Sequence, residues 1–169
     1  MSRTPDPQKN DIPEGFTLGM ALMDLMPVVF FGIGVAAVGR RLNSGLFWTG
    51  AVLCIAAGLG KVSWKLCLAL MKKNIPLLNK QLRVLMPAGF VLLLAGVLTS
   101  PQRLPAAKIW AGVLQMPAAL FFAGGIAGMI AMMVMGRTRS SLDAKANWHE
   151  QLVNALTQLA LLLGVLFWR

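Results

Sequence analysis

Long apolar segments are the feature that most limits what this chain can fold into. Between Phe16 and Trp168 the sequence is almost continuously apolar, with several runs of about 18 or more apolar residues. Runs of this length are typical of transmembrane helices, because a helix satisfies its own backbone hydrogen bonds in lipid. Only 13% of the residues are charged, whereas about a quarter of a soluble domain is charged. The sequence therefore predicts an all-α integral membrane protein, a bundle of five transmembrane helices.

The five expected spans account for almost all of the apolar sequence. They cover residues 16–39, 46–71, 76–99, 108–135 and 147–168, in a single membrane domain of residues 16–169. The third span is the shortest in strictly apolar residues, since its apolar stretch begins only at Val84, and a re-entrant segment is the alternative there. Residues 1–15 contain three prolines and both acidic and basic side chains. This composition predicts a flexible cytoplasmic tail and not a signal peptide.

Basic residues are distributed unequally between the two ends of the expected bundle. Five spans place the termini on opposite sides, so that nine Lys and Arg residues fall on the N-terminal side and five on the other. The nine are Arg3, Lys9, Lys72, Lys73, Lys80, Arg83, Arg137, Arg139 and Lys145. The five are Arg40, Arg41, Arg103, Lys108 and Arg169. Because Lys and Arg accumulate on the cytoplasmic side, we predict that the N-terminus is inside and the C-terminus outside.

The net charge of +10 does not indicate nucleic-acid binding, because most of the basic residues lie in short loops beside spans.

The two cysteines, Cys54 and Cys67, fall on one expected helix, too far apart for a disulfide and without metal-ligand spacing. The chain has one histidine and no HExxH, phosphate-binding or dinucleotide-binding motif. The sequence therefore predicts no metal site, no cofactor and no catalytic residue.

Three charged residues lie inside the apolar spans, at similar depth. Asp24 is about eight residues into the first span, or roughly 12 Å at helical rise. Lys61 and Lys65 lie about ten and six residues from the same face of the membrane, on the second span. Their spacing of four places both lysines on one face of that helix. Ionisable residues at this depth are costly unless they are paired or hydrated, and by default they indicate a functional site.

A stripe of amide side chains runs along the fifth span at the same depth. Asn147, Gln151, Asn154 and Gln158 fall within about 60° of one another on a helix, and Glu150 flanks the stripe. From residue 159 to the end of the span at Trp168 the helix is purely apolar.

Two interpretations of these polar residues remain open. In the structural one, carboxylates pair with lysines and amides join helices, and Lys65 can instead reach the membrane surface. In the other, the residues line a hydrated pocket, because two lysines, two carboxylates and four amides exceed what five helices need and buried ion pairs rarely add net stability. We predict a side-chain contact within about 4 Å, which is ion-pair range, between Asp24 or Glu150 and at least one of the two lysines. The candidate ligand-binding residues are Asp24, Lys61, Lys65, Glu150, Gln151, Asn154 and Gln158.

Two further patterns concern helix shape and packing. The dipeptides Met26-Pro27, Met86-Pro87 and Met116-Pro117 each fall inside an expected span, where a proline kinks a helix. The kinks either shape a cavity or hinge, or they are ordinary packing bends. Gly124 and Gly128 have GxxxG spacing in the fourth span, which we expect to serve packing within the chain more than a dimer interface.

The sequence thus predicts a small transporter or transport-complex subunit of the plasma (cell inner) membrane, with a cytoplasm-facing pocket for a polar or anionic ligand. One alternative is a membrane enzyme that acts on a lipid head group, with Glu150 or Asp24 as general base. Another is a structural or assembly subunit of a membrane complex. The small size and odd number of spans favour a homo-oligomer or a partner membrane subunit. Membrane lipids are the other expected partners, and nucleic acid is not.

Overall fold

The chain folds into helices joined by short connections. The structure is a computed structural model, and it describes residues 15–103, 105–138 and 143–168. In these ranges it contains seven helices, namely α1 (Leu18–Leu42), α2 (Gly45–Met71), α3 (Pro76–Lys80), α4 (Leu82–Leu98), α5 (Ala106–Leu114), α6 (Ala118–Thr138) and α7 (Ala144–Phe167). Most of the predicted cytoplasmic tail, residues 1–14, lies outside the described residues.

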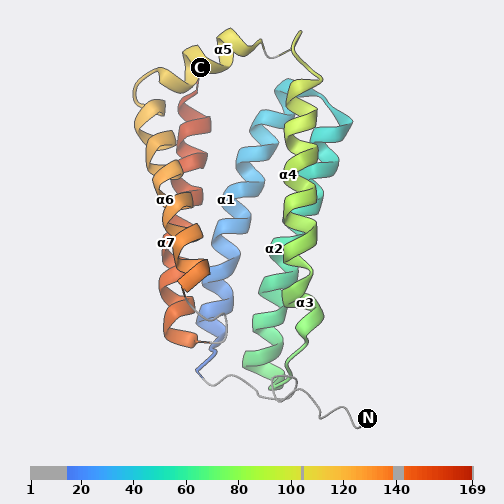
Figure 1. The fold of residues 1–169 in the computed structure, drawn as a ribbon, viewed down its shortest axis with the longest axis vertical. Coiled ribbons are helices and arrows are strands. Elements are labelled where there is room, and N and C mark those ends of the chain that lie inside the picture. Colours follow the sequence, from blue (N-terminus) through green and yellow to red (C-terminus); the bar gives the residue numbers. More distant parts are fainter. Residues whose placement is uncertain (1–14, 104, 139–142, 169) are drawn as a thin grey trace.

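Within the described ranges, five segments are long and apolar enough to cross a membrane. They are α1, α2, the combined α3–α4 segment Pro76–Leu98, most of α6, and α7. This confirms the prediction of an all-α membrane protein with five spans. The start of α1 and the end of α7 lie at opposite ends of the bundle, which we call the N-terminal and C-terminal ends (Figure 1). Which of these ends faces the cytoplasm stays a prediction.

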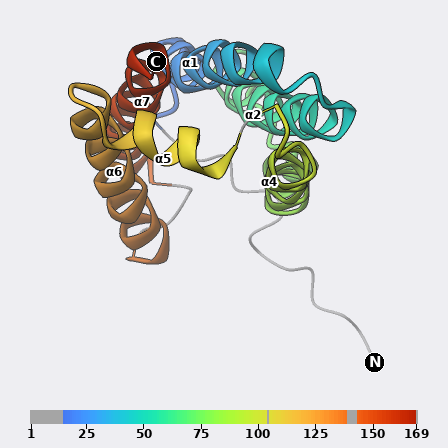
Figure 2. The same cartoon turned by 90° about the horizontal axis from the view of Figure 1, so that it is seen from above.

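The long helices form an arc and not a closed ring. Adjacent pairs that pack together are α6 with α7, α7 with α1, α1 with α2, and α2 with α4. Seen along the bundle, α4 and α6 stand at the two ends of this arc (Figure 2). The short helix α5 crosses the space between them at the C-terminal end of the bundle (Figures 1 and 2). We call the side of the bundle between α4 and α6 the lateral opening.

The segment expected as one span over residues 108–135 consists of two helices. The α5 helix ends at Leu114, and α6 begins at Ala118, directly after Pro117. Proline removes a backbone donor and disfavours helical geometry in the residue before it, which accounts for a break here. Pro27 and Pro87, in contrast, lie inside α1 and α4. The spanning part of this segment is therefore α6 alone, and α5 caps one end of the bundle.

The ends of the long helices follow from local sequence. Thr17, Ser44 and Asp143 each accept a hydrogen bond from a backbone N–H in the first turn of α1, α2 and α7. Such side chains satisfy donors that a helix start leaves free. The α1 and α2 helices end where Asn43 and Lys72 adopt left-handed backbone geometry, with φ of 47° and 51°. A left-handed residue at this position lets the next N–H groups bond to the last carbonyls.

Glycines allow α2 and α4 to approach at backbone distance. A Cβ atom at Gly50 would lie 2.6 Å from the carbonyl oxygen of Gly89 and 2.7 Å from the nitrogen of Leu93. A Cβ atom at Gly96 would lie 2.6 Å from the nitrogen of Phe47. Small residues that let two backbones approach closely are typical of membrane helix interfaces. This interface fixes α4 at one end of the arc.

The α6 helix uses a different pair of glycines from the one expected. A Cβ at Gly125 would clash with Leu161, and one at Gly128 would clash with Thr157, both on α7. A Cβ atom at Gly124 would have no neighbouring atom of another described helix within 4 Å. The close α6–α7 contact therefore involves Gly125 and Gly128, and the GxxxG interpretation was wrong for Gly124. The expected packing within the chain is observed at Gly128.

Aromatic residues close both ends of the bundle. At the N-terminal end, the rings of Phe16 and Trp64 meet edge to face with centroids 5.6 Å apart. At the C-terminal end, Trp168 is buried against Gly112 of α5, where a Cβ atom would clash with the indole. The guanidinium of Arg41 lies 5.2 Å from the centroid of the Trp168 ring, within the range of a cation–π interaction. These contacts hold α5 and the end of α7 to α1.

Candidate functional site

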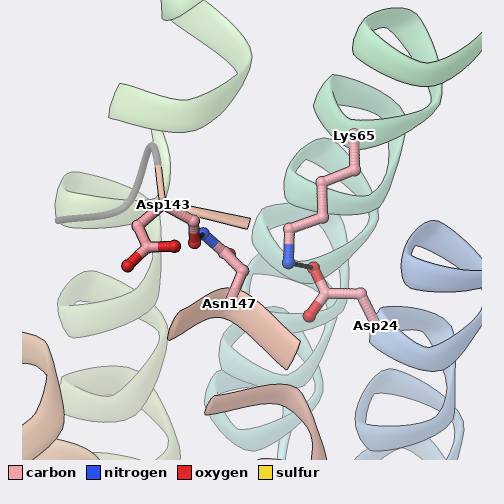
Figure 3. A network of polar contacts seen from close by, with 4 residues as sticks. All are labelled: Asp24, Lys65, Asp143 and Asn147. Carbon is pink, nitrogen blue, oxygen red and sulfur yellow. Dashed lines mark hydrogen bonds and ion pairs between the residues drawn. The ribbon is translucent and has the colours of Figure 1, made fainter. Parts of the chain in front are cut away.

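A buried ion pair joins α1 to α2 near the N-terminal end of the bundle. Lys65 Nζ lies 2.9 Å from Asp24 Oδ2, and the two side chains are 0% and 5% exposed. The predicted contact between a carboxylate and a lysine at this depth is thus confirmed. Figure 3 shows the Lys65 side chain extending from α2 toward Asp24 on α1. Because Lys65 is fully buried, the alternative in which it reaches the membrane surface was wrong.

Gln151 connects the same pair to α7. With its amide oriented to satisfy its neighbours, the oxygen accepts a hydrogen bond from Lys65 Nζ at 2.5 Å. The amide nitrogen then donates to the carbonyl oxygen of Met20 at 3.0 Å. Gln151 is 2% exposed, so both groups would otherwise be buried without partners. Lys65 therefore ties together three helices, α1, α2 and α7.

The first amide of the stripe has a local role at the start of α7. Asn147 is buried, and its Nδ2 donates to the carbonyl oxygen of Asp143 at 3.0 Å, as Figure 3 shows. The Asp143 carboxylate in turn caps the helix by accepting from the backbone nitrogens of Lys145 and Ala146. Asn147 and Gln151 therefore both serve the helix framework, which matches the structural interpretation for this half of the stripe.

A cavity of about 610 Å³ lies directly beside this framework. Five helices contribute to its wall, namely α1, α2, α4, α6 and α7. The lining residues are Asp24, Pro27, Val28, Phe31, Cys54, Gly58, Lys61, Leu82, Met86, Phe90, Met129, Met132, Met133, Asn154, Thr157 and Gln158. Its volume falls within the range of about 300–1,000 Å³ that small-molecule sites occupy.

Lys61 is the cation that faces this cavity. It lies one turn from Lys65 on α2 and is half-buried. Among the residues that the structure describes, no carboxylate oxygen lies within 4.0 Å of its ammonium group. Asp24 also lines the cavity, but its Oδ2 is engaged by Lys65. Lys61 is therefore left to interact with whatever occupies the cavity.

Two amides lie on the cavity wall beside Lys61. Asn154 and Gln158 of α7 are half-buried, and neither side chain makes a hydrogen bond to another described residue. Thr157 lies between them, but its hydroxyl donates to the carbonyl oxygen of Val153 at 2.6 Å. The donors and acceptors of the two amides are therefore not used within the described chain, whereas the hydroxyl proton of Thr157 is used in a hydrogen bond.

Apolar residues make up the rest of the wall. Methionines and phenylalanines from α1, α4 and α6 contribute most of it, and they are Phe31, Met86, Phe90, Met129, Met132 and Met133. None of them was among the candidate residues from the sequence. The abundance of methionine, 11 in the chain, was a weak signal, because methionine in a span is generally only an apolar residue.

The candidate residues divide into three groups in the structure. Asp24, Lys61, Asn154 and Gln158 line the cavity. Lys65 and Gln151 are buried and contact one another outside its lining. Glu150 is half-buried and is neither in the lining nor, within the described residues, in an ion pair with a lysine.

Metal-binding clusters are absent from the part of the chain that the structure describes. The described residues contain no group of three or more His, Cys, Asp or Glu side chains that could hold a metal ion. The single histidine, His149, is exposed, and its Nδ1 is 2.9 Å from the carbonyl oxygen of Lys145. Cys54 lines the cavity, and its thiol donates to the carbonyl oxygen of Met86 at 3.8 Å.

Comparison with known proteins assigns no family. No protein-family model matches the chain, and no curated protein or solved structure matches it either. A function must therefore be inferred from the cavity and from the polar groups on its wall.

Proposed function

We propose that this protein is a small membrane transporter, or a subunit of a transport complex, that binds a polar or anionic ligand in the cavity. The observation that carries the proposal is the position of Lys61. Lys61 belongs to a candidate spanning helix and to the lining of a cavity of about 610 Å³, and no carboxylate oxygen lies within 4.0 Å of its ammonium group among the described residues. A charge at membrane depth is costly, and such residues are typical of substrate and ion pathways.

The charges around the cavity favour an anion. Asp24 and Lys65 neutralise each other at 2.9 Å, which leaves the ammonium of Lys61 as the charge on the cavity wall without a close partner in the described chain. The free amides of Asn154 and Gln158 can donate to an anionic group and orient it. The cavity spans the middle of the bundle, and its two charged lining residues, Asp24 and Lys61, lie toward the N-terminal end, which we assign to the cytoplasm from the excess of basic residues there.

The two alternatives from the sequence have less support. The enzyme alternative needs a general base, but Asp24 is paired with Lys65 and Glu150 lies outside the cavity lining. A purely structural polar layer accounts for Lys65 and Gln151, which contact three helices. It does not account for Lys61, whose side chain makes no hydrogen bond or ion pair to another residue in the described ranges. A bound anionic ligand would interact with the ammonium group of Lys61, whereas helix packing leaves this group without a partner in the described chain.

A transport assay with a lysine control tests the proposal. The protein is reconstituted into liposomes on a solid-supported membrane, and charge movement is recorded on addition of inorganic phosphate, succinate or octanoate. We expect a current with at least one of these anions, reduced at least tenfold in Lys61→Met. Lys108→Met, at an exposed position on α5, should match the parent protein. Absence of a current for all three anions in the parent, or an equal current in Lys61→Met, would contradict transport through this site.

A further inference from the structure

The chemistry of the cavity wall is divided between its two sides. The five polar lining residues come from α1, α2 and α7, and they are Asp24, Lys61, Asn154, Thr157 and Gln158. The α4 and α6 helices contribute only apolar side chains, which are Leu82, Met86, Phe90, Met129, Met132 and Met133. A small hydrophilic anion would contact the first side and leave the second without a partner. A ligand with a charged end and an apolar end matches both.

The apolar side of the cavity is also the exposed side. Phe90 on α4 and Met129 and Met133 on α6 are 46%, 50% and 55% exposed. On the polar side, Asp24 and Thr157 are buried, and Lys61 is half-buried. The exposed lining residues belong to the two helices that stand at the ends of the arc (Figure 2). The cavity therefore faces the lateral opening, which in a membrane is filled by lipid chains.

Methionine and phenylalanine suit such an opening. A methionine side chain is unbranched, flexible and polarizable, so that a surface rich in methionine adapts to apolar groups of different shape. Met129, Met132 and Met133 form one edge of the cavity, and Met86 and Phe90 form the facing edge. A hydrocarbon chain between these edges would bury apolar surface from both. Its charged end would then reach Lys61.

We propose that the cavity binds an anionic amphiphile, with its acidic head group on Lys61, Asn154 and Gln158 and its hydrocarbon chain between α4 and α6, so that the molecule enters sideways from the membrane. This inference rests on the proposed ligand-binding role of the cavity and adds the class of ligand and its route. The acidic group is a phosphate monoester or a carboxylate, since one ammonium and two amides recognise both. A phosphate without a chain is the competing source of the same head-group chemistry.

Native mass spectrometry in a non-ionic detergent tests the head group. The probes are 1-oleoyl lysophosphatidate, 1-oleoyl lysophosphatidylcholine with the same chain, and inorganic phosphate without a chain. We expect lysophosphatidate adducts at concentrations at least tenfold lower than for either other probe. Lys61→Met should reduce lysophosphatidate binding to the level of lysophosphatidylcholine, whereas Lys61→Arg should retain it. Equal binding of the two lysolipids, or equal binding of phosphate and lysophosphatidate, would overturn the inference.

A tryptophan at the lateral opening tests the route without altering the charge. Met133→Trp adds a bulky ring on the cavity edge of α6, and Ile130→Trp adds one at an equally exposed α6 position outside the lining. We expect lysophosphatidate binding to fall at least fivefold in Met133→Trp and to be unchanged in Ile130→Trp. Equal binding by both variants would exclude the lateral route, even if Lys61→Met failed to fold.

The two proposals fail in different ways. Lysophosphatidate adducts that depend on Lys61, together with no current in the liposome assay, would contradict transport and leave the amphiphile site intact. A Lys61-dependent current with succinate or phosphate, together with no preference for lysophosphatidate, would contradict the amphiphile site and leave transport intact.

Discussion

The Asp24–Lys65 ion pair allows a sharp test of how the bundle is held together. Both side chains are almost completely buried, and they lie 2.9 Å apart on different helices. Replacing Asp24 by Leu leaves the ammonium buried without its carboxylate, and replacing Lys65 by Met leaves the carboxylate buried without its ammonium. Breaking a buried pair in this way costs about 3–5 kcal/mol of folding free energy. Each single variant should therefore be strongly destabilised.

The double variant should recover most of this loss. Replacing both members of a buried pair by apolar residues is often neutral or stabilising. Here the Gln151 oxygen would also lose its bond from Lys65 Nζ, and an unsatisfied buried polar group costs about 1–3 kcal/mol. We therefore expect Asp24→Leu/Lys65→Met to be destabilised by about 1–3 kcal/mol, well below the sum of the single variants. The coupling energy should be at least about 3 kcal/mol.

Reversible unfolding in mixed micelles, followed by tryptophan fluorescence, measures these free energies. Lys61→Met is the matched control, because it removes a lysine one turn away on α2 that has no carboxylate within 4.0 Å in the described chain. The control should change the free energy of unfolding by less than about 1 kcal/mol, as expected for a charge without a close partner. If the two single variants were additive, or if Lys61→Met cost as much as Lys65→Met, the division of roles between the two lysines would be wrong.

Two further predictions concern packing and orientation. Gly50→Ala should destabilise the protein by about 1–3 kcal/mol, because its Cβ would lie 2.6 Å from the Gly89 oxygen. Gly124→Ala, where the added Cβ would meet open space, should be neutral or stabilising by up to about 1 kcal/mol. Thermal unfolding of both variants is the measurement, and equal melting temperatures would contradict the close α2–α4 approach. Cysteines added at the two termini should be labelled by a membrane-impermeant maleimide in intact cells at the C-terminus only, and external labelling of the N-terminus would reverse the proposed orientation.

The sequence predicted the spans and the depth of the polar residues well. Hydropathy alone gives the number of spans, since each must be long and apolar enough to cross lipid, although the fourth begins at Ala118 and not at Lys108. A rise of about 1.5 Å per residue then brings Asp24 on α1 and Lys65 on α2 to the same level. Their contact at 2.9 Å follows, because two opposite charges at one depth of a small bundle are each costly alone. These predictions needed only the position of each residue along its own helix.

Predictions that depend on how helices are rotated and packed were less successful. Lys61 and Lys65 share a helix face, and nothing in the sequence indicates that Lys65 takes the carboxylate while Lys61 faces a cavity. Glu150 lies next to Gln151, yet of these two residues Gln151 is the one that hydrogen-bonds to Lys65, and Glu150 forms no ion pair with a described lysine. The break before Pro117 was also missed, since the same Met-Pro dipeptide is accommodated inside α1 and α4. Each outcome depends on contacts between helices, which a single sequence does not specify.

The two lysines of α2 lie in different surroundings, and we propose that one serves stability and the other binding. Lys65 is surrounded by α1 and α7, so its charge is compensated by Asp24 and Gln151 and removing it should weaken the fold. Lys61, one turn nearer the middle of the membrane, belongs to the lining of the cavity, to which α4 and α6 also contribute. For a lysine without a close partner at this position, no ion-pair attraction offsets the free-energy cost of desolvating the ammonium group. We propose that the missing partner is a ligand, and that this ligand reaches Lys61 from the membrane through the lateral opening.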